Sequence, residues 1–133
     1  MAKSDWKGCK MDYQDLVETA FQMIVNAGDA RTSVKSALDA AMGGDSAAAS
    51  LKMGEARGFI EEAHRLQTGA VQQEAAGERL EYSMLFTHAQ DTLMTIYSEY
   101  HLAQKMIAMY DALSAKIAEL QEVCRASSQE HRA

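Results

Sequence analysis

The sequence contains no proline and only eight glycines in 133 residues, so the residues that most often break helices are scarce. Alanine, methionine, leucine, glutamate and glutamine, which favour helices, are frequent instead. The composition therefore predicts an all-α fold. A chain of this length forms a single domain with one sizeable hydrophobic core.

Cysteine is also scarce, because the chain has only Cys9 and Cys124, each near a terminus. They form no Cys-x-x-Cys arrangement, so we expect free thiols in a reducing compartment rather than a disulfide. The first eleven residues lack the apolar core of a signal peptide. No apolar run approaches the roughly 18 residues that span a bilayer. We therefore expect a cytoplasmic protein.

Positive charge is in the minority, since 13 lysines and arginines face 19 aspartates and glutamates, for a formal net charge of −6. An acidic surface disfavours binding to nucleic acid and to an anionic membrane face. The sequence also has no glycine-rich phosphate loop following a strand. These absences exclude several function classes and select none.

Apolar residues recur at alternating steps of three and four from Tyr13 to the glycine pair at 43–44, which predicts one long helix. Gly28 lies inside this pattern without shifting its phase, at a cost of about 1 kcal/mol. Glycine readily adopts the left-handed conformation that ends a helix, so the pair marks the end. Asp45 or Ser46 then caps a second helix.

A connection at residues 74–78 leads to the third and longest helix, predicted from about Tyr82 to about Cys124. We expect a flexible tail at 1–11, a three-helix domain at 12–124 and a second tail at 125–133. The expected architecture is an antiparallel three-helix bundle.

The third helix carries two apolar lines instead of one. The first contains Phe86, Leu93 and Ile96, among others, and the second contains Met84, Leu102, Met106, Met109 and Leu113. A helix of a monomeric three-helix bundle needs only one buried face. The second line therefore predicts packing against another copy of the chain, as a homo-oligomer.

His88 and Asp91 interrupt the second apolar line, and their spacing of three puts both side chains on one helix face. An unprotonated imidazole nitrogen is a nucleophile that can accept a phosphoryl group. An aspartate repeated by symmetry would repel its copies unless they shared a divalent cation, for which oxygen ligands suit Mg²⁺. From periodicity alone, a polar pair on a solvated face is equally compatible.

The other histidines have simpler interpretations. His64 lies beside a core position and is expected to be half-buried and structural, His101 is expected to be exposed, and His131 falls in the tail. Glu61 and His64 superficially match the Glu-x-x-His motif of di-iron carboxylate bundles. Those bundles use two copies of the motif, whereas this chain has one.

Several segments between about residues 12 and 115 form an ordered set. They are Ala27-Gly28-Asp29-Ala30-Arg31, Glu62-Ala63-His64 with Gln67-Thr68-Gly69, Glu74-Ala75 with Gly77-Glu78, and His88-Ala89-Gln90-Asp91 with Leu93-Met94. With these segments the sequence resembles the enzyme IIA component of the lactose/cellobiose (chitobiose) class of the bacterial sugar phosphotransferase system.

The resemblance implies a homotrimer of three-helix subunits. His88 is then the phosphoryl acceptor, which receives the phosphoryl group from the phosphocarrier HPr and passes it to a cysteine of the IIB component. Contact with the membrane is only indirect, through the sugar-importing IIC component. Asp91 of the three subunits is expected to hold one shared Mg²⁺ at the trimer axis, and Gln90 resembles the glutamine near the site.

Thr92 stands where the family usually has a second histidine, so a potential cation near the phosphoryl group is replaced by a hydroxyl. Thr92 and His64 are therefore kept as accessory positions. The alternative function is a trimeric helical scaffold or regulator that no longer relays phosphate. The helix beyond about Leu113 exceeds the family's common pattern, and the sugar is not encoded in this component.

Overall fold

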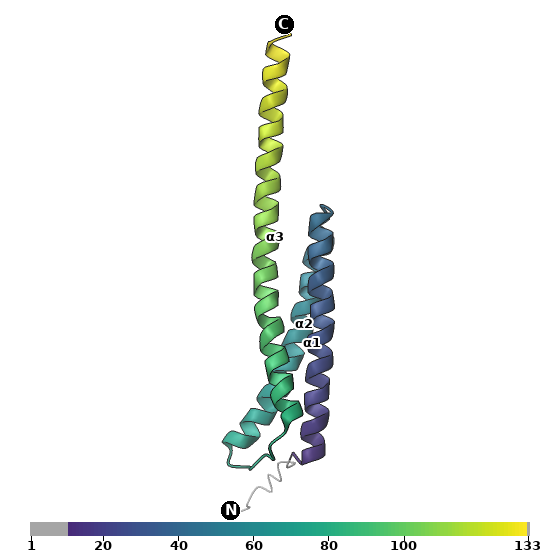
Figure 1. Ribbon diagram of the computed structural model, residues 1–133, viewed down its shortest axis with the longest axis vertical. Helices are drawn as coiled ribbons and strands as arrows, with labels where there is room; N and C mark the ends of the chain where they lie inside the picture. Colours follow the sequence, from purple (N-terminus) through teal and green to yellow (C-terminus); the bar gives the residue numbers. More distant parts are fainter. Residues whose placement is uncertain (1–10, 133) are drawn as a thin grey trace, which may run out of the picture.

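The computed structural model describes residues 11–132, which form three helices and no strand. They are α1 (Tyr13–Met42), α2 (Ser46–Ala75) and α3 (Met84–Glu130). Successive helices run in opposite directions, and α3 continues far beyond the ends of α1 and α2 (Figure 1). The predicted all-α three-helix bundle is confirmed. Within the described residues, no helix is both long and apolar enough to cross a membrane.

Each helix begins after a residue whose side chain accepts a hydrogen bond from the first turn. Asp12 accepts from the Asp15 amide at 2.9 Å, Asp45 from the Ala48 amide at 2.9 Å and Ser83 from the Phe86 amide at 3.2 Å. These bonds satisfy amides that have no partner inside the helix. For the second helix the sequence predicted either Asp45 or Ser46 as the cap, and the structure has Asp45.

The core of the bundle consists mostly of alanine. Met23, Leu93 and Ile96 are the largest fully buried side chains. Small residues at the contacts allow helices to approach closely, and the few larger side chains fill the space between them. The fully buried alanines are Ala20, Ala27, Ala30 and Ala37 of α1 and Ala56, Ala63 and Ala70 of α2, with Ala89 of α3.

The C-terminal end of α3 differs from the expectation. Residues 125–130, predicted as part of an irregular tail, continue the helix to Glu130. This stretch contains no glycine or proline, and Arg125 pairs with Glu122 at 2.9 Å across one turn. The expected N-terminal tail at 1–11 lies, apart from Met11, outside the described residues.

Gly28 offers a test of the unbroken first helix. It is exposed in the middle of α1, and an added Cβ would meet no atom within 4 Å. We expect Gly28→Ala to raise the free energy of unfolding by about 0.5–1 kcal/mol, measured by chemical denaturation. Gly77→Ala is the control and should be destabilising, because Gly77 has φ +93°. A destabilised Gly28→Ala variant would contradict the open surface seen at this position.

Candidate functional site

His88 and Asp91 lie near the start of α3, and both side chains are exposed. Within residues 11–132, no hydrogen bond or ion pair holds the His88 ring or the Asp91 carboxylate. The hydroxyl of Thr92 donates to the His88 carbonyl oxygen at 2.8 Å. The hydroxyl of Thr95 donates in the same way to the Asp91 carbonyl oxygen at 2.8 Å. The imidazole and the carboxylate are therefore free to meet another molecule.

The face of α3 that carries His88 and Asp91 has apolar side chains before and after a polar stretch that ends with Thr95 and Ser98. The exposed large side chains Met84, Leu102 and Met106 lie on this face at helical spacings of three and four, each between 56% and 74% exposed. The buried face of α3 is a different one, built on Ala89, Leu93 and Ile96. The two predicted apolar faces are therefore both present, and α1 and α2 cover only one. We call the uncovered face, from Met84 to Met109, the His88 face.

The side chain of Gln90 does not lie beside that of His88 within one subunit. The two residues are two positions apart, so their side chains leave α3 in different directions. Gln90 is only partly exposed, on the other side of the helix from His88. Within one subunit the structure thus brings together His88, Asp91 and Thr92, and it separates Gln90 from them.

His64 comes from α2 and packs against a part of α3 that does not carry His88. Its ring meets Tyr97 edge-on with the centroids 5.4 Å apart, and Tyr97 meets His101 at 4.5 Å. Tyr97 follows His88 by nine residues, about two and a half turns, so it lies on the opposite side of α3. His64 is half-buried and His101 is exposed, as the sequence predicted. The spacing of four between Tyr97 and His101 could have indicated this aromatic cluster, but the sequence analysis missed it.

The acidic residues beside His64 are committed to ion pairs. Glu62 pairs with Arg65 at 2.6 Å and Glu61 with Arg57 at 3.4 Å. Hydrogen bonds from Arg65 hold the pKa of the Glu62 carboxyl below its ordinary value. These pairs leave the Glu-x-x-His segment no carboxylate arranged for a metal.

A metal site at Asp91 would need more than one copy of the chain. Among the described residues, no group of three or more histidine, cysteine, aspartate or glutamate side chains could hold a metal ion. Each chain presents a single exposed carboxylate at Asp91, whose oxygens suit Mg²⁺. The residues fit such an ion only where several copies of Asp91 come together.

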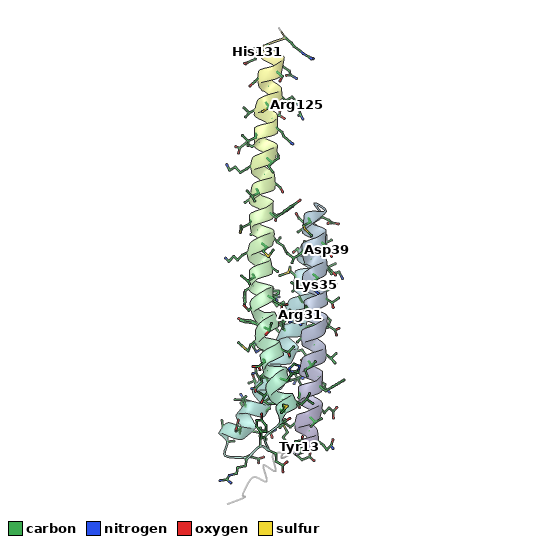
Figure 2. All side chains as sticks on the ribbon, in the orientation of Figure 1. Tyr13, Arg31, Lys35, Asp39, Arg125 and His131 are labelled. Carbon is green, nitrogen blue, oxygen red and sulfur yellow. The ribbon has the colours of Figure 1, made fainter. Side chains whose placement is uncertain are left out.

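An ion pair between α1 and α3 was also missed by the sequence analysis. The guanidinium of Arg31 binds both carboxylate oxygens of Glu99, at 2.8 and 3.1 Å, which raises the pKa of Arg31. Figure 2 labels Arg31 on α1, beside α3. A two-point contact of this kind fixes the orientation of both side chains. The arginine of the segment Ala27–Arg31 therefore links α1 to α3.

The comparison with known proteins settles the family. The model for "PTS system, Lactose/Cellobiose specific IIA subunit" matches residues 18–111. The chain belongs to this family. The predicted resemblance is thereby confirmed, and the chain is a phosphotransferase component of the IIA type.

Two relatives illustrate the extent of the match. The lichenan-specific phosphotransferase enzyme IIA component of Bacillus subtilis (strain 168) is 34% identical over 101 residues, which cover 76% of this chain and 92% of the relative. The lactose-specific EIIA component of the PTS system of Lactococcus lactis subsp. lactis is 39% identical over 100 residues, which cover 75% and 95%. The names of these IIA relatives do not agree on one sugar.

Solved structures of the family have the same fold. The PTS cellobiose specific enzyme IIA from Bacillus anthracis superimposes with a TM-score of 0.73 at 40% identity, over 80% of this chain and 96% of that chain. The IIA(Chitobiose) protein in its complex with HPr from Escherichia coli gives a TM-score of 0.67 at 33% identity, over 74% and 96%. These IIA proteins are thus covered almost completely, whereas about a fifth or more of this chain has no counterpart in them.

Proposed function

We propose that this IIA component relays phosphoryl groups through His88 in the cytoplasm, from HPr to the cysteine of a IIB component, during uptake of a lactose/cellobiose-type sugar. The observation that carries the proposal is the exposed imidazole of His88 on the face that α1 and α2 leave open. A family relative forms a complex with HPr, which supports HPr as the donor.

The transfer follows from the chemistry of the ring. The unprotonated nitrogen of His88 attacks the phosphorus of the donor, and the bond from phosphorus to the donor breaks as the N–P bond forms. The thiolate of the IIB cysteine then attacks the same phosphorus and releases the imidazole. Thr92 bonds the His88 carbonyl oxygen and does not donate to the phosphoryl group while that bond lasts. Donors that meet the charge of the phosphoryl oxygens therefore come from the partner protein or from another copy of this chain.

We further propose that the chain forms a homotrimer in which the His88 faces of three copies meet, with Asp91 at the axis and His88 in the groove between subunits, where HPr can reach it. The large exposed apolar side chains on this face support the assembly, because apolar side chains gathered on one exposed face mark interaction sites. Asp91 of the three copies would hold one shared Mg²⁺. The ion would neutralise three like charges that otherwise repel one another.

Phosphorylation of the intact protein tests the relay. The chain is incubated with phosphoenolpyruvate, enzyme I and HPr, and its mass is read under alkaline conditions that preserve phosphohistidine. We expect a gain of about 80 Da per chain, one phosphoryl group. Addition of the IIB component should then remove it.

The same experiment separates the relay from the scaffold alternative, which Thr92 supports. A scaffold takes no phosphoryl group, or takes one and does not pass it to the IIB component. Either result, obtained with the oligomer intact, would replace the relay with the scaffold.

A further inference from the structure

The last 19 helical residues of α3, 112–130, project beyond the ends of α1 and α2. We call this segment the extension. Just before the extension, the hydroxyl of Tyr110 donates to the Met42 carbonyl oxygen at 3.1 Å. Every side chain of the extension is exposed. Figures 1 and 2 show it projecting alone beyond the bundle, with Arg125 labelled on it.

The extension is also outside the part of the chain that the family shares. The family match ends at residue 111. The lichenan-specific relative is covered over 92% of its own length while only 76% of this chain is used. A purpose for the extension therefore has to come from its own residues.

Those residues carry a heptad pattern. Apolar or weakly polar side chains follow one another at steps of three, four, three and four, in the order Tyr110, Leu113, Ile117, Leu120 and Cys124. A stripe of this period is the packing surface of a coiled coil, in which each side chain inserts between four residues of a neighbouring helix. Leu113, Ile117 and Leu120 are each more than half exposed in the single chain.

The extension gains no stability from packing in the single chain. Most helical stability in proteins comes from packing an amphipathic face, so a partner that covers the stripe would stabilise the extension. The bundle offers no cover, since α1 ends at Met42 beside Tyr110 and α2 begins at Ser46, and the extension projects beyond both ends (Figure 1).

We propose that the extension forms a parallel, in-register, three-stranded coiled coil with two further copies of this chain. The number of strands rests on the homotrimer of the proposed function. The His88 face continues through Met106 and Met109 directly into the heptad stripe, so helices that meet along that face arrive at the extension side by side and in the same direction.

The charges of the extension fit identical partners. Lys116 pairs with Glu119 at 3.2 Å and Arg125 with Glu122 at 2.9 Å, both within one helix. Of these side chains only Lys116 lies beside the stripe, and Glu119, Glu122 and Arg125 fall on the outer side of the helix. Three copies therefore bring few charges face to face. Like charges facing one another would have opposed self-association.

Cross-linking through Cys124 tests whether the helices of the proposed coiled coil are parallel and in register. Cys124 occupies a position of the stripe, so each copy presents its thiol to the Cys124 of its neighbours only if the helices are parallel and aligned. In a Cys9→Ser background, copper-phenanthroline and oxygen should oxidise two such thiols to one disulfide, with loss of two protons and two electrons to the oxidant. Because a trimer has three thiols, about two thirds of the chains should become covalent dimers.

A matched variant controls for random collision. In Cys9→Ser/Cys124→Ser/Ala126→Cys the thiol stands two residues further along, on the outer side of the extension, where we expect cross-linking to be at least about tenfold slower. Equal rates at positions 124 and 126, or no cross-link at 124, would overturn the parallel coiled coil. Antiparallel pairing or a different protein partner gives the second of these results.

Self-association supplies an independent measurement. We expect Ile117→Glu/Leu120→Glu to raise the concentration at which the oligomer half dissociates by at least about 100-fold, read by analytical ultracentrifugation. Ala115→Glu/Ala118→Glu adds the same charge to the outer side and should change it little. An unchanged oligomer in the first variant contradicts the proposal.

Labelling by HPr keeps this inference separate from the relay. If the chain cross-links through Cys124 but accepts no phosphoryl group, the coiled-coil proposal stands and the relay proposal fails. If the chain accepts the phosphoryl group but does not cross-link, the relay proposal stands and the coiled-coil proposal fails.

Discussion

Replacing His88 with alanine is expected to remove the phosphoryl acceptor, so that the mass gain produced by HPr disappears and transfer falls by at least about 1,000-fold. The His88 ring is exposed and makes no hydrogen bond within residues 11–132, so its loss should leave the fold of the single chain unchanged. The measurement is the intact mass after incubation with phosphoenolpyruvate, enzyme I and HPr, together with the thermal midpoint of each variant.

His101→Ala is the matched control, because His101 is also an exposed histidine of α3 but lies against Tyr97, on the other side of the helix. It should be labelled like the parent chain. His64→Ala should also be labelled, with some loss of stability from the contact between His64 and Tyr97. Labelling that survives in His88→Ala, or that vanishes in His101→Ala alone, would assign the acceptor to another histidine.

The main features of this fold follow from local patterns. Steps of three and four in the apolar residues, without any proline, leave little choice but long helices, and Asp45 marks the second start by capping the Ala48 amide. Periodicity also separated the two faces of α3. Such patterns depend only on neighbours within a few positions, which is why the sequence alone was sufficient.

The end of α3 was predicted too early for a physical reason. Residues 125–130 contain no breaker, yet they lack a clear apolar stripe, and a stripe was taken as the sign of a helix. The helix there is supported by a pair across one turn, between Glu122 and Arg125. Helix ends without a glycine, a proline or a cap carry a weak signal in a sequence.

The contacts between helices could not be predicted from spacing. The pair of Arg31 with Glu99 and the packing of His64 on Tyr97 each join residues on different helices. They depend on how far one helix is shifted along another, which periodicity does not report. The positions of His88, Asp91 and Thr92 relative to one another could be predicted, because these residues are neighbours on one helix. Whether Gln90 joins them in the oligomer depends on the other copies.

The second large effect is expected at Asp91, where the proposed trimer would bring three carboxylates together. Removal of Mg²⁺ with EDTA should raise the concentration at which the parent oligomer half dissociates by at least about tenfold, because the three charges then repel one another. Asp91→Asn lacks these charges, so its association should not respond to EDTA. Analytical ultracentrifugation with Mg²⁺ and with EDTA measures both.

Asp39→Asn is the control, since it removes an exposed carboxylate from α1 rather than from the His88 face, and it should respond to EDTA like the parent chain. The extension should not change this response. Ile117 lies 26 residues after Asp91, about 40 Å along α3, so contacts in the coiled coil and charges at Asp91 contribute independently. The fold-change caused by EDTA should therefore be the same in Ile117→Glu/Leu120→Glu as in the parent chain. If EDTA weakens Asp91→Asn as strongly as the parent chain, the ion is bound elsewhere and Asp91 is not its ligand.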